Sequence, residues 1–406
     1  MKIIYISSAC YPDDKDEIDK TAKIRLENNS IKFHNLILDG LKNQKCVNEI
    51  YSIIGLPISI KSNSKIFWKK REKIIDNVIY NQVKFINIPI IKQLHMADSI
   101  YRSVKKIVKH NNINELIVIY DASFVSVMPK VNKLIKRYKL KSIGIFADIY
   151  DYMADVNRKS NKCRITKLIF KEKMNTVYSN SSAYIFLTEQ MNNLINKVNK
   201  PYIVIEGFSD IKMKDASIDL NNKYKEKVCL YAGGLYERYG LKTLIEAFKS
   251  IENDTIRLHL YGTGELEDYI KNINDSRIKY YGMVNNDIII KKEIKATLLI
   301  NPRFSNEEYT EYSFPSKIME YMSTGTPVLT TKLKGIPEEY SKYLYYFEDE
   351  TCQGMKNKLE EILSLNIDEL NKKGKSAREF VLKNKNNIKQ TKKIIELIST
   401  IERNKK

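Results

Sequence analysis

Short apolar segments alternate with amphipathic helical patterns, and this alternation runs twice along the 406 residues. Continuous apolar strands separated by helices are typical of parallel sheets that are covered on both faces. We therefore expect an α/β chain with two Rossmann-like, doubly wound halves. The expected strands lie at 2–7, 49–54, 115–120, 142–147, 183–187 and 202–206, and then at 227–232, 256–261, 278–281, 296–300 and 327–330.

Helical patterns fill the intervals between these strands, and a hairpin is expected at 74–88. A polar stretch at 212–226 lacks apolar periodicity and is interpreted as a linker. It divides an N-terminal domain, 1–211, from a second domain, 227–385, and a C-terminal helix at 386–406 is expected to pack back on the first domain. Ligands of doubly wound sheets bind beyond the carboxyl ends of the strands, which predicts a site in the cleft between the halves.

The distribution of charge is uneven. Residues 1–210 hold 35 Lys and Arg against 20 Asp and Glu, so they carry +15 of the formal +20. The segment from Arg158 to Lys173 has seven basic residues against Glu172 alone, interleaved with apolar ones. It is interpreted either as a basic amphipathic helix on an anionic membrane or as a solvated face. Nucleic acid is the least favoured partner.

Cysteine and histidine usage argues against a metal centre and a disulfide framework. The five cysteines and four histidines are scattered, without a CxxC pair, which suits a reducing compartment. No stretch approaches the roughly 20 apolar residues that span a bilayer. Because Met1 leads directly into an apolar strand, we expect a cytoplasmic protein without a signal peptide.

The segment Arg303–Val328 carries the most chemical information. Pro315 suits the first turn of a helix, and the free N–H groups at Ser313 to Ser316 form an anion site at its positive end. Lys317 and Glu320 then share one helix face. They are either a surface ion pair or, functionally, a cation for a diphosphate and an acceptor for ribose hydroxyls.

Two glycine motifs follow expected strands in the second half. Gly233-Gly234 ends the strand at 227–232, and a turn without side chains lets backbone approach a phosphate. An ordinary strand-to-helix turn is the alternative. Gly262 and Gly264 follow the next strand, and Gly282-Met283-Val284 follows the one after it.

Taken together, these motifs resemble the donor-binding signature of retaining GT-B glycosyltransferases of family four, in a capsule and exopolysaccharide branch. The resemblance implies that Glu320 holds the ribose, that backbone at Met283 and Val284 reads the base, and that Phe314 is the aromatic of the motif. It is good over 227–345 and weak before 183.

The sequence departs from that family at three positions. The first motif glutamate is replaced by Tyr312, with Glu311 one place early as a substitute. The two usual loop cations are replaced by Gly234 and Tyr239. Arg238 is the nearest replacement, and Arg303 is a second candidate. Arg238, Lys317 and Glu311 are therefore the predicted catalytic residues.

Candidate acceptor residues lie at strand ends of the first half. The loop Ser7–Lys20 is expected to face the cleft. Asp148 and Asp151 follow the strand at 142–147, with turn capping as the alternative role. His34 opens the next helix, where a core or surface role is favoured over catalysis.

The resemblance implies a retaining hexosyltransferase that uses a nucleotide sugar, with UDP-sugar expected, and a lipid-linked or polysaccharide acceptor. No cofactor is expected, and fixed positive charge is expected to stabilise the leaving diphosphate without a metal. Two alternatives stay open: a sugar-nucleotide epimerase of the same architecture, and an inactive partner subunit.

Overall fold

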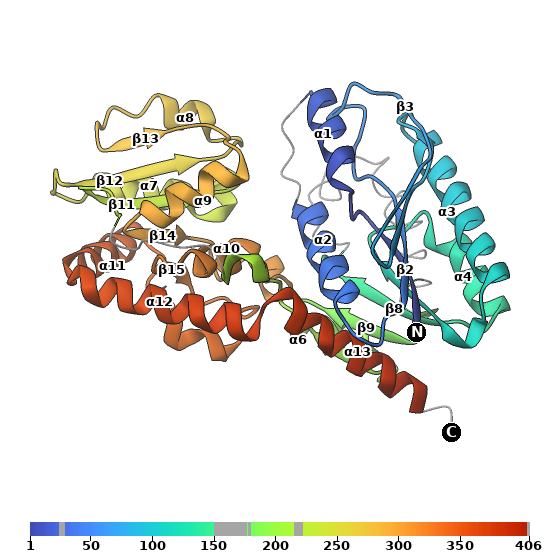
Figure 1. Cartoon of the computed structure of the whole chain (residues 1–406). Helices are drawn as coiled ribbons and strands as arrows, with labels where there is room; N and C mark the ends of the chain where they lie inside the picture. Colours follow the sequence, from blue (N-terminus) through green and yellow to red (C-terminus); the bar gives the residue numbers. More distant parts are fainter. Residues whose placement is uncertain (24–28, 150–176, 178–179, 215–221, 404–406) are drawn as a thin grey trace. The chain divides into compact units, whose positions relative to one another are not determined.

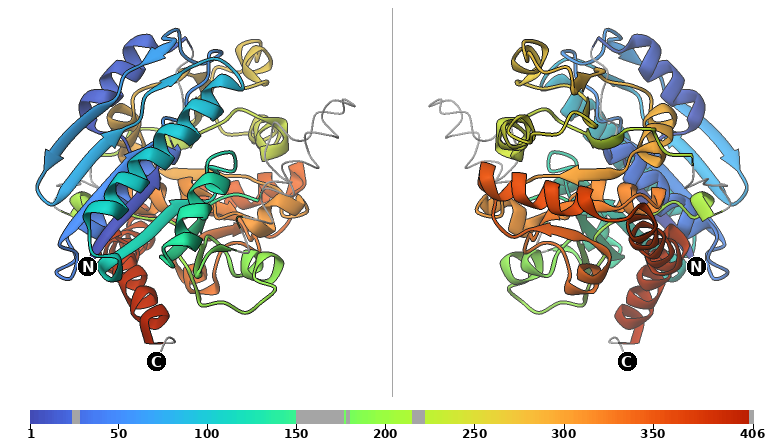
Figure 2. Two further views of the ribbon diagram at one scale, coloured as in Figure 1. Left: turned by 90° about the vertical axis from the view of Figure 1, so that its right-hand side faces the viewer. Right: turned by 90° about the vertical axis from the view of Figure 1, so that its left-hand side faces the viewer.

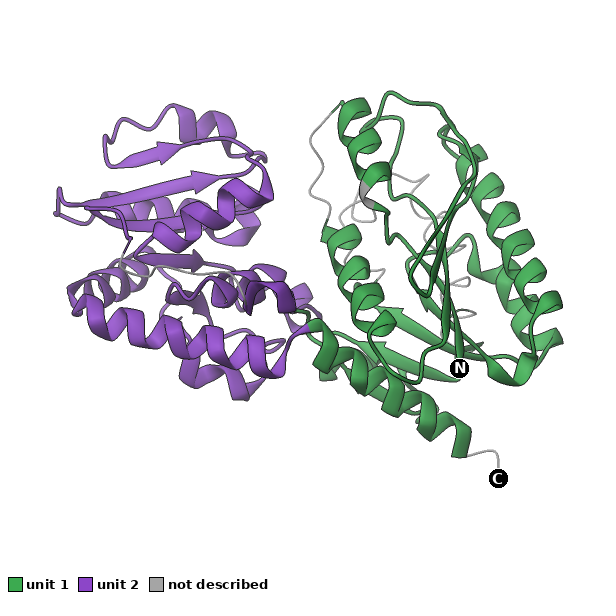
Figure 3. Cartoon of the chain, in the orientation of Figure 1, with its two compact units in different colours: residues 1–208, 387–406 green, residues 209–386 purple. Residues whose placement is uncertain are grey.

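The computed structural model describes residues 1–23, 29–149, 177, 180–214 and 222–403. They form two units, residues 1–208 with 387–406 and residues 209–386 (Figure 3). The expected basic helix at 158–173 lies outside the described residues, as does Asp151. Each unit is a sheet with helices on both faces (Figure 1).

Unit 1 is built on an eight-stranded sheet in the order β10-β9-β8-β7-β1-β2-β5-β4. All neighbours pair in parallel except β4 and β5, whose antiparallel hairpin forms the edge of the sheet (Figure 2). The strands are β1 (Lys2–Ser7), β2 (Glu49–Ile54), β4 (Arg71–Ile75), β5 (Val78–Gln82), β7 (Leu116–Asp121), β8 (Lys141–Phe146), β9 (Ala183–Phe186) and β10 (Tyr202–Val204). A separate two-stranded sheet pairs β3 (Phe67–Trp68) with β6 (Phe85–Ile86).

Helices cover both faces of the unit 1 sheet (Figure 1). On one face, α2 (Asn29–Lys42) and α13 (Asn387–Arg403) bury Leu38, Leu41 and Ile394 against β1 and its neighbours. The other face carries α3 (Ile91–His110) and α4 (Met128–Arg137). The final helix is therefore part of unit 1, although it follows unit 2 in the sequence. A short helix, α6 (Glu189–Ile195), follows β9.

The expected loop at 7–20 is wrong, because most of it forms helix α1 (Pro12–Thr21). Pro12 occupies the first turn and Asp13 and Asp14 lie at the positive end of the helix, both favourable starts. The helix escaped detection because its sequence is almost entirely polar, so it shows no apolar period.

Unit 2 has a six-stranded, fully parallel sheet in the order β13-β12-β11-β14-β15-β16. Its helices α7, α8 and α11 pack on one face, and α9, α10 and α12 pack on the other. The strands are β11 (Lys227–Ala232), β12 (Ile256–Tyr261), β13 (Ile278–Tyr280), β14 (Leu298–Asn301), β15 (Val328–Thr331) and β16 (Tyr345–Phe347). The helices are α7 (Leu241–Lys249), α8 (Glu267–Lys271), α9 (Asn286–Lys295), α10 (Ser316–Thr324), α11 (Cys352–Ser364) and α12 (Ile367–Asn384).

Part of the segment expected to be a linker packs firmly on unit 2. The Lys223 ammonium donates to the carbonyls of Ile294 and Ala296 at 2.7 and 3.0 Å. Burial lowers the pKa of Lys223 to about 8. Among the described residues, no helix combines the length and apolar composition needed to cross a bilayer.

A histidine is buried among tyrosine rings in unit 2. His259 on β12 lies 5.5 Å from the ring of Tyr224 and 5.0 Å from that of Tyr281, and its Nδ1 has no described hydrogen-bond partner. Burial lowers its pKa to about 4, helped by nearby cations such as Lys279. The folded protein therefore keeps this imidazole neutral.

This burial predicts acid sensitivity. The unfolded chain takes up a proton at His259 near pH 6.5, whereas the folded chain resists until about pH 4. The free energy of unfolding should therefore decrease as the pH is lowered from 6.5 to about 4. The decrease should reach about 2 kcal/mol once partial solvent screening is allowed for. Urea unfolding at pH 7 and pH 5 measures this loss. His259→Phe should lose less stability over the same interval; an unchanged pH dependence would contradict the assignment.

Candidate functional site

The strand order of unit 2 reverses between β11 and β14, so the connections after these two strands leave in opposite directions. Such a reversal opens a crevice at the carboxyl edge of a parallel sheet, where ligands bind. The loop after β11 contains Gly233, Gly234 and Arg238, and the loop after β14 contains Arg303. Four predicted site residues therefore meet at the reversal.

The predicted glycines bring three strand ends into direct backbone contact. The N–H of Gly233 donates to the carbonyl of Tyr261 at 3.0 Å, and that of Gly262 donates to Gly282 at 2.9 Å. Gly262 has φ 127°, and a Cβ there would lie 1.8 Å from the carbonyl oxygen of Gly233. Only glycine fits such an approach. A Cβ at Gly264 would lie 2.4 Å from the carbonyl oxygen of Leu235, so the loops carrying the four donor glycines and Met283-Val284 line one edge.

Two arginines stand on tyrosine rings at this edge. The guanidinium carbon of Arg238 lies 4.3 Å from the ring centroid of Tyr309, and that of Arg303 lies 4.6 Å from that of Tyr239. Neither arginine forms an ion pair with a described carboxylate. The Nε of Arg238 is buried and has no hydrogen-bond partner among the described residues. We call Arg238, Tyr239, Arg303 and Tyr309 the arginine–tyrosine cluster.

Helix α10 is fastened to the same edge by one hydroxyl. Tyr321, which is fully buried, accepts from the N–H of Ala232 at 2.8 Å and lies 3.2 Å from its carbonyl. Pro315 precedes the helix and offers no side-chain cap to its first N–H groups. The buried Oγ of Ser313 also lacks a described partner. The start of α10 therefore keeps hydrogen-bonding capacity for an anion.

Lys317 and Glu320 form the ion pair expected from their spacing, with Nζ and Oε1 2.9 Å apart. Both side chains are largely buried, at 25% and 14% exposed, so the pair is more than a solvated surface contact. The pair lies in the first turns of α10. The predicted roles, Lys317 as a cation for a diphosphate and Glu320 as an acceptor for ribose hydroxyls, stay predictions.

The other predicted donor residues lie in or beside η5 (Glu308–Tyr312). Glu311 pairs with Lys334 at 3.1 Å, and Tyr312 ends the turn half-buried. Phe314 is buried in the core, 5.3 Å from the ring of Tyr340. Phe314 therefore supports the loop by packing.

Unit 1 has its own strand-order reversal, between β1 and β7, and a pocket of about 280 Å³ lies there. Its lining comes from the segments that follow β1 and β2, from the end of β7 and the residues after it, and from the first turns of α2 and α3. Hydroxyls of Ser8, Ser30 and Ser123, the carboxylate of Asp121 and the ring of Phe124 contribute to it. This pocket is the candidate acceptor site of unit 1.

A buried chain of hydrogen bonds fixes the pocket carboxylate. Nε2 of His34 lies 2.9 Å from Oδ2 of Asp121, and Nδ1 lies 2.6 Å from the hydroxyl of Tyr5. Burial would raise the pKa of Asp121, but His34 and the hydrogen bonds from His34 and Ser123 outweigh it, so the pKa is lowered. His34, predicted as an acceptor-side residue, therefore holds the Asp121 carboxylate in place through this hydrogen bond.

Lys92 is the second ionisable group of the pocket. Its ammonium donates to the carbonyls of Leu56, at 2.9 Å, and Ile58. Burial lowers its pKa to about 8. Asp148 lies exposed two residues beyond β8, at the carboxyl edge of the same sheet.

Sequence reasoning missed Asp121, Lys92, Tyr309 and Tyr321. Asp121 carried a usable signal, because it directly follows the strand expected at 115–120, as Asp148 follows its own. The other three have no local pattern.

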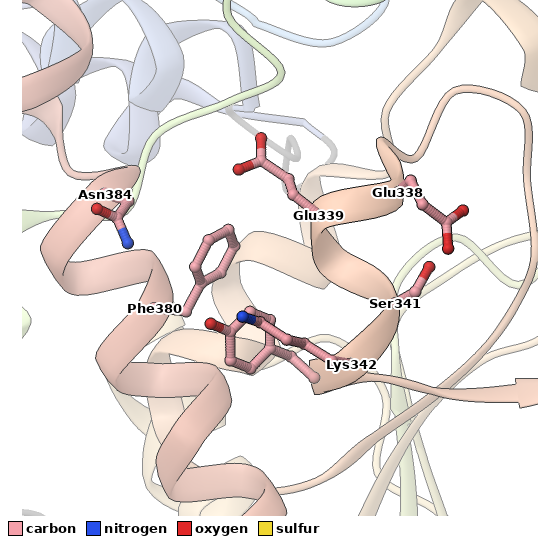
Figure 4. A pocket seen from close by; sticks show the side chains of 7 residues that line it. Glu338, Glu339, Ser341, Lys342, Phe380 and Asn384 are labelled. Atoms are coloured by element: carbon pink, nitrogen blue, oxygen red, sulfur yellow. The ribbon is translucent and has the colours of Figure 1, made fainter.

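Another hollow, of about 460 Å³, lies on unit 2 away from the predicted residues (Figure 4). Phe380 and Tyr343 stack there at 4.4 Å, and Glu338, Glu339 and Lys342 surround them. Among the described residues, no three His, Cys, Asp or Glu side chains gather as a metal site would require.

Comparison with known proteins finds a family match in the second half of the chain. Residues 226–364 match the family of glycosyl transferases group 1. The match contains the glycine loops, the arginine–tyrosine cluster and α10. The search of curated proteins found no significant match.

Structural comparison shows that the fold is GT-B, as predicted. Sucrose-phosphate synthase from Thermosynechococcus elongatus is similar at a TM-score of 0.67 and 14% identity, over 99% of each chain. HepE from Anabaena in complex with UDP has a TM-score of 0.61 and 13% identity, over 98% of this chain and 100% of that one. An E. coli trehalose-6-phosphate structure bound with UDP-2-fluoro glucose has a TM-score of 0.65 and 8% identity, over 99% of each chain.

The anchor between α10 and β11 yields a stability prediction. Tyr321→Phe leaves the buried backbone groups of Ala232 without the tyrosine hydroxyl. The free energy of unfolding of unit 2 should therefore fall by about 2 kcal/mol. Chemical denaturation measures this loss. Tyr343→Phe is the matched control, because the Tyr343 hydroxyl has no described partner, and should change stability by less than about 0.5 kcal/mol. Equal effects would show that the Tyr321 hydroxyl is not an anchor.

Proposed function

We propose that the protein transfers a hexose, with retention of configuration, from a UDP-sugar to a lipid-linked or polysaccharide acceptor of a surface glycan. The observation that carries this proposal is the arginine–tyrosine cluster. Two cations that pair with no described carboxylate lie at the strand-order reversal of unit 2, within the residues that match glycosyl transferases group 1. A nucleoside diphosphate has the charge to complement them.

Binding of the donor would use the carboxyl edge of unit 2. The backbone at Met283 and Val284 would read the base, Glu320 would accept from the ribose hydroxyls, and the glycine loops would admit the diphosphate. Arg238, Arg303 and Lys317, together with the first N–H groups of α10, would supply its positive field.

Transfer breaks the bond between the anomeric carbon and the diphosphate and forms a bond from that carbon to the acceptor oxygen. The departing diphosphate gains negative charge, which the fixed cations stabilise more strongly than they stabilise the bound donor. In the retaining course, the acceptor attacks from the leaving-group side and its proton passes to a phosphate oxygen. We propose that this charge stabilisation needs no bound metal.

The acceptor would bind in unit 1. Its pocket combines a fixed carboxylate, Asp121, with several hydroxyls and the apolar ring of Phe124, which suits the hydroxyls and apolar face of a sugar. For a lipid-linked acceptor, the protein would work at the inner face of the cell membrane.

The deciding experiment incubates the protein with UDP-sugar, with and without a membrane glycolipid extract, in the presence of EDTA. Acceptor-dependent release of UDP is expected. A new UDP-sugar formed without acceptor would indicate the epimerase instead. No turnover under any condition, with nucleotide bound, would favour the inactive partner subunit, and loss of transfer only in EDTA would refute the metal-free mechanism.

Substitutions in unit 2 test the cation assignment. Arg238→Ala, Arg303→Ala and Lys317→Ala should each weaken UDP binding by about tenfold to 100-fold, because each removes a charge-assisted contact. Calorimetry measures the binding, and sugar transfer should fall at least as much. Arg257→Ala is the control, because Arg257 lies at the opposite end of β12 and pairs with Glu226. Unchanged affinity in all three variants would remove the cluster from the donor site.

A further inference from the structure

Six large apolar side chains lie exposed together on unit 1, although elsewhere its sheet is well covered. Ile90 is 73% exposed, Phe67 is 68% and Leu94 is 59%. We call the set the apolar patch. Its members are Ile66, Phe67, Ile88, Ile90, Ile91 and Leu94.

The patch is continuous in space. β3 and β6 place Phe67 directly opposite Ile86, and the N–H of Asn87 donates to the carbonyl of Ile66 at 2.7 Å. The chain then passes through Ile88 and Ile90 into the first turn of α3. The exposed residues of the two-stranded sheet and those of the helix start therefore form one surface.

Backbone strain holds the most exposed member outward. Ile90 has φ 68° and ψ −53°, and the N–H of Ile91 donates to the carbonyl of Pro89 at 2.8 Å across it. This is a γ-turn with positive φ, a rare and strained arrangement for a β-branched residue. An unfavourable backbone conformation at an exposed isoleucine points to a role for that side chain.

The charge around the patch identifies its partner. The segment 61–95 contains eight Lys and Arg and two carboxylates. Lys65, Arg71 and Lys73 pair with carboxylates of α1, and Lys70 pairs with Glu72. Lys61, Lys69 and Lys84 are exposed and form no ion pair with a described carboxylate. A second copy of the chain on this face would bring these lysines together across a symmetric interface. A negatively charged surface with an apolar interior complements both features.

The patch also adjoins the candidate acceptor pocket. Lys92 and Gln93, which line the pocket, lie between Ile91 and Leu94 at the start of α3. The patch and the pocket therefore share the first turn of α3.

We propose that the apolar patch inserts into the interfacial region of an anionic lipid bilayer and presents the unit 1 pocket to it. This deepens the proposed function, on whose lipid-linked acceptor it rests. It assigns membrane contact to described residues that are separate from the basic segment 158–173.

Co-sedimentation of the full chain with vesicles tests the proposal. Binding is expected to phosphatidylcholine vesicles containing phosphatidylglycerol, and much less to pure phosphatidylcholine. Phe67→Ser and Leu94→Ser should each weaken binding about tenfold, because each removes one large apolar side chain from the bilayer. Ile90→Gly should weaken it similarly while relieving the positive-φ strain, so its thermal stability should be retained.

Ile74→Ser is the matched control. Ile74 is 67% exposed but lies on β4 at the far end of the β4–β5 hairpin, so vesicle binding should stay unchanged. Equal binding by the patch variants, no binding by the unaltered chain, or a dimer that Leu94→Ser dissociates would each overturn the proposal. Vesicle binding needs no donor, so it is scored separately from transfer to a water-soluble acceptor.

Discussion

Burial of both faces of two parallel sheets is the constraint on which the rest of the structure depends. Helices cover both faces of each sheet, so the strand ends are the places where polar groups can gather without disturbing the core. The strand order reverses at β1 and β7 in unit 1 and at β11 and β14 in unit 2. Each reversal separates two adjacent connections, and the candidate residues collect in the space that this leaves.

The carboxyl edges of the two sheets differ in how their charged groups are held. In unit 2, Arg238 and Arg303 rest on tyrosine rings and form no ion pair with any carboxylate that the structure describes. Arg277, in contrast, pairs with Asp275 at 2.8 Å. An aromatic face steadies a guanidinium without neutralising its charge. That arrangement preserves a positive field for an anionic ligand.

In unit 1, the pocket carboxylate is held as an anion by His34 and Ser123, and Lys92 is held by backbone carbonyls. These groups are fixed before any ligand arrives, which lowers the entropy cost of binding a hydroxyl-rich molecule. The apolar patch beside them exposes several large hydrophobic side chains to solvent. Recognition of a sugar and contact with a lipid surface would thus use neighbouring parts of one unit.

Local periodicity was sufficient for most of the fold. The strands at 2–7, 49–54, 227–232 and 256–261 were predicted to the residue, because a buried parallel strand is a continuous apolar run with polar ends. Helix α1 failed that test, since almost no apolar residue marks its face. β16 was also missed.

The sequence by itself determined the two doubly wound halves and the donor glycines, since each depends on neighbouring residues. Only the tertiary structure decided that the two arginines would lie over the rings of Tyr309 and Tyr239. It also decided that Tyr321 would form a hydrogen bond with Ala232, and that Asp121 would contact His34. The partners in these contacts are as many as 89 residues apart, as for Tyr321 and Ala232. Their proximity follows from strand order, which no local pattern records.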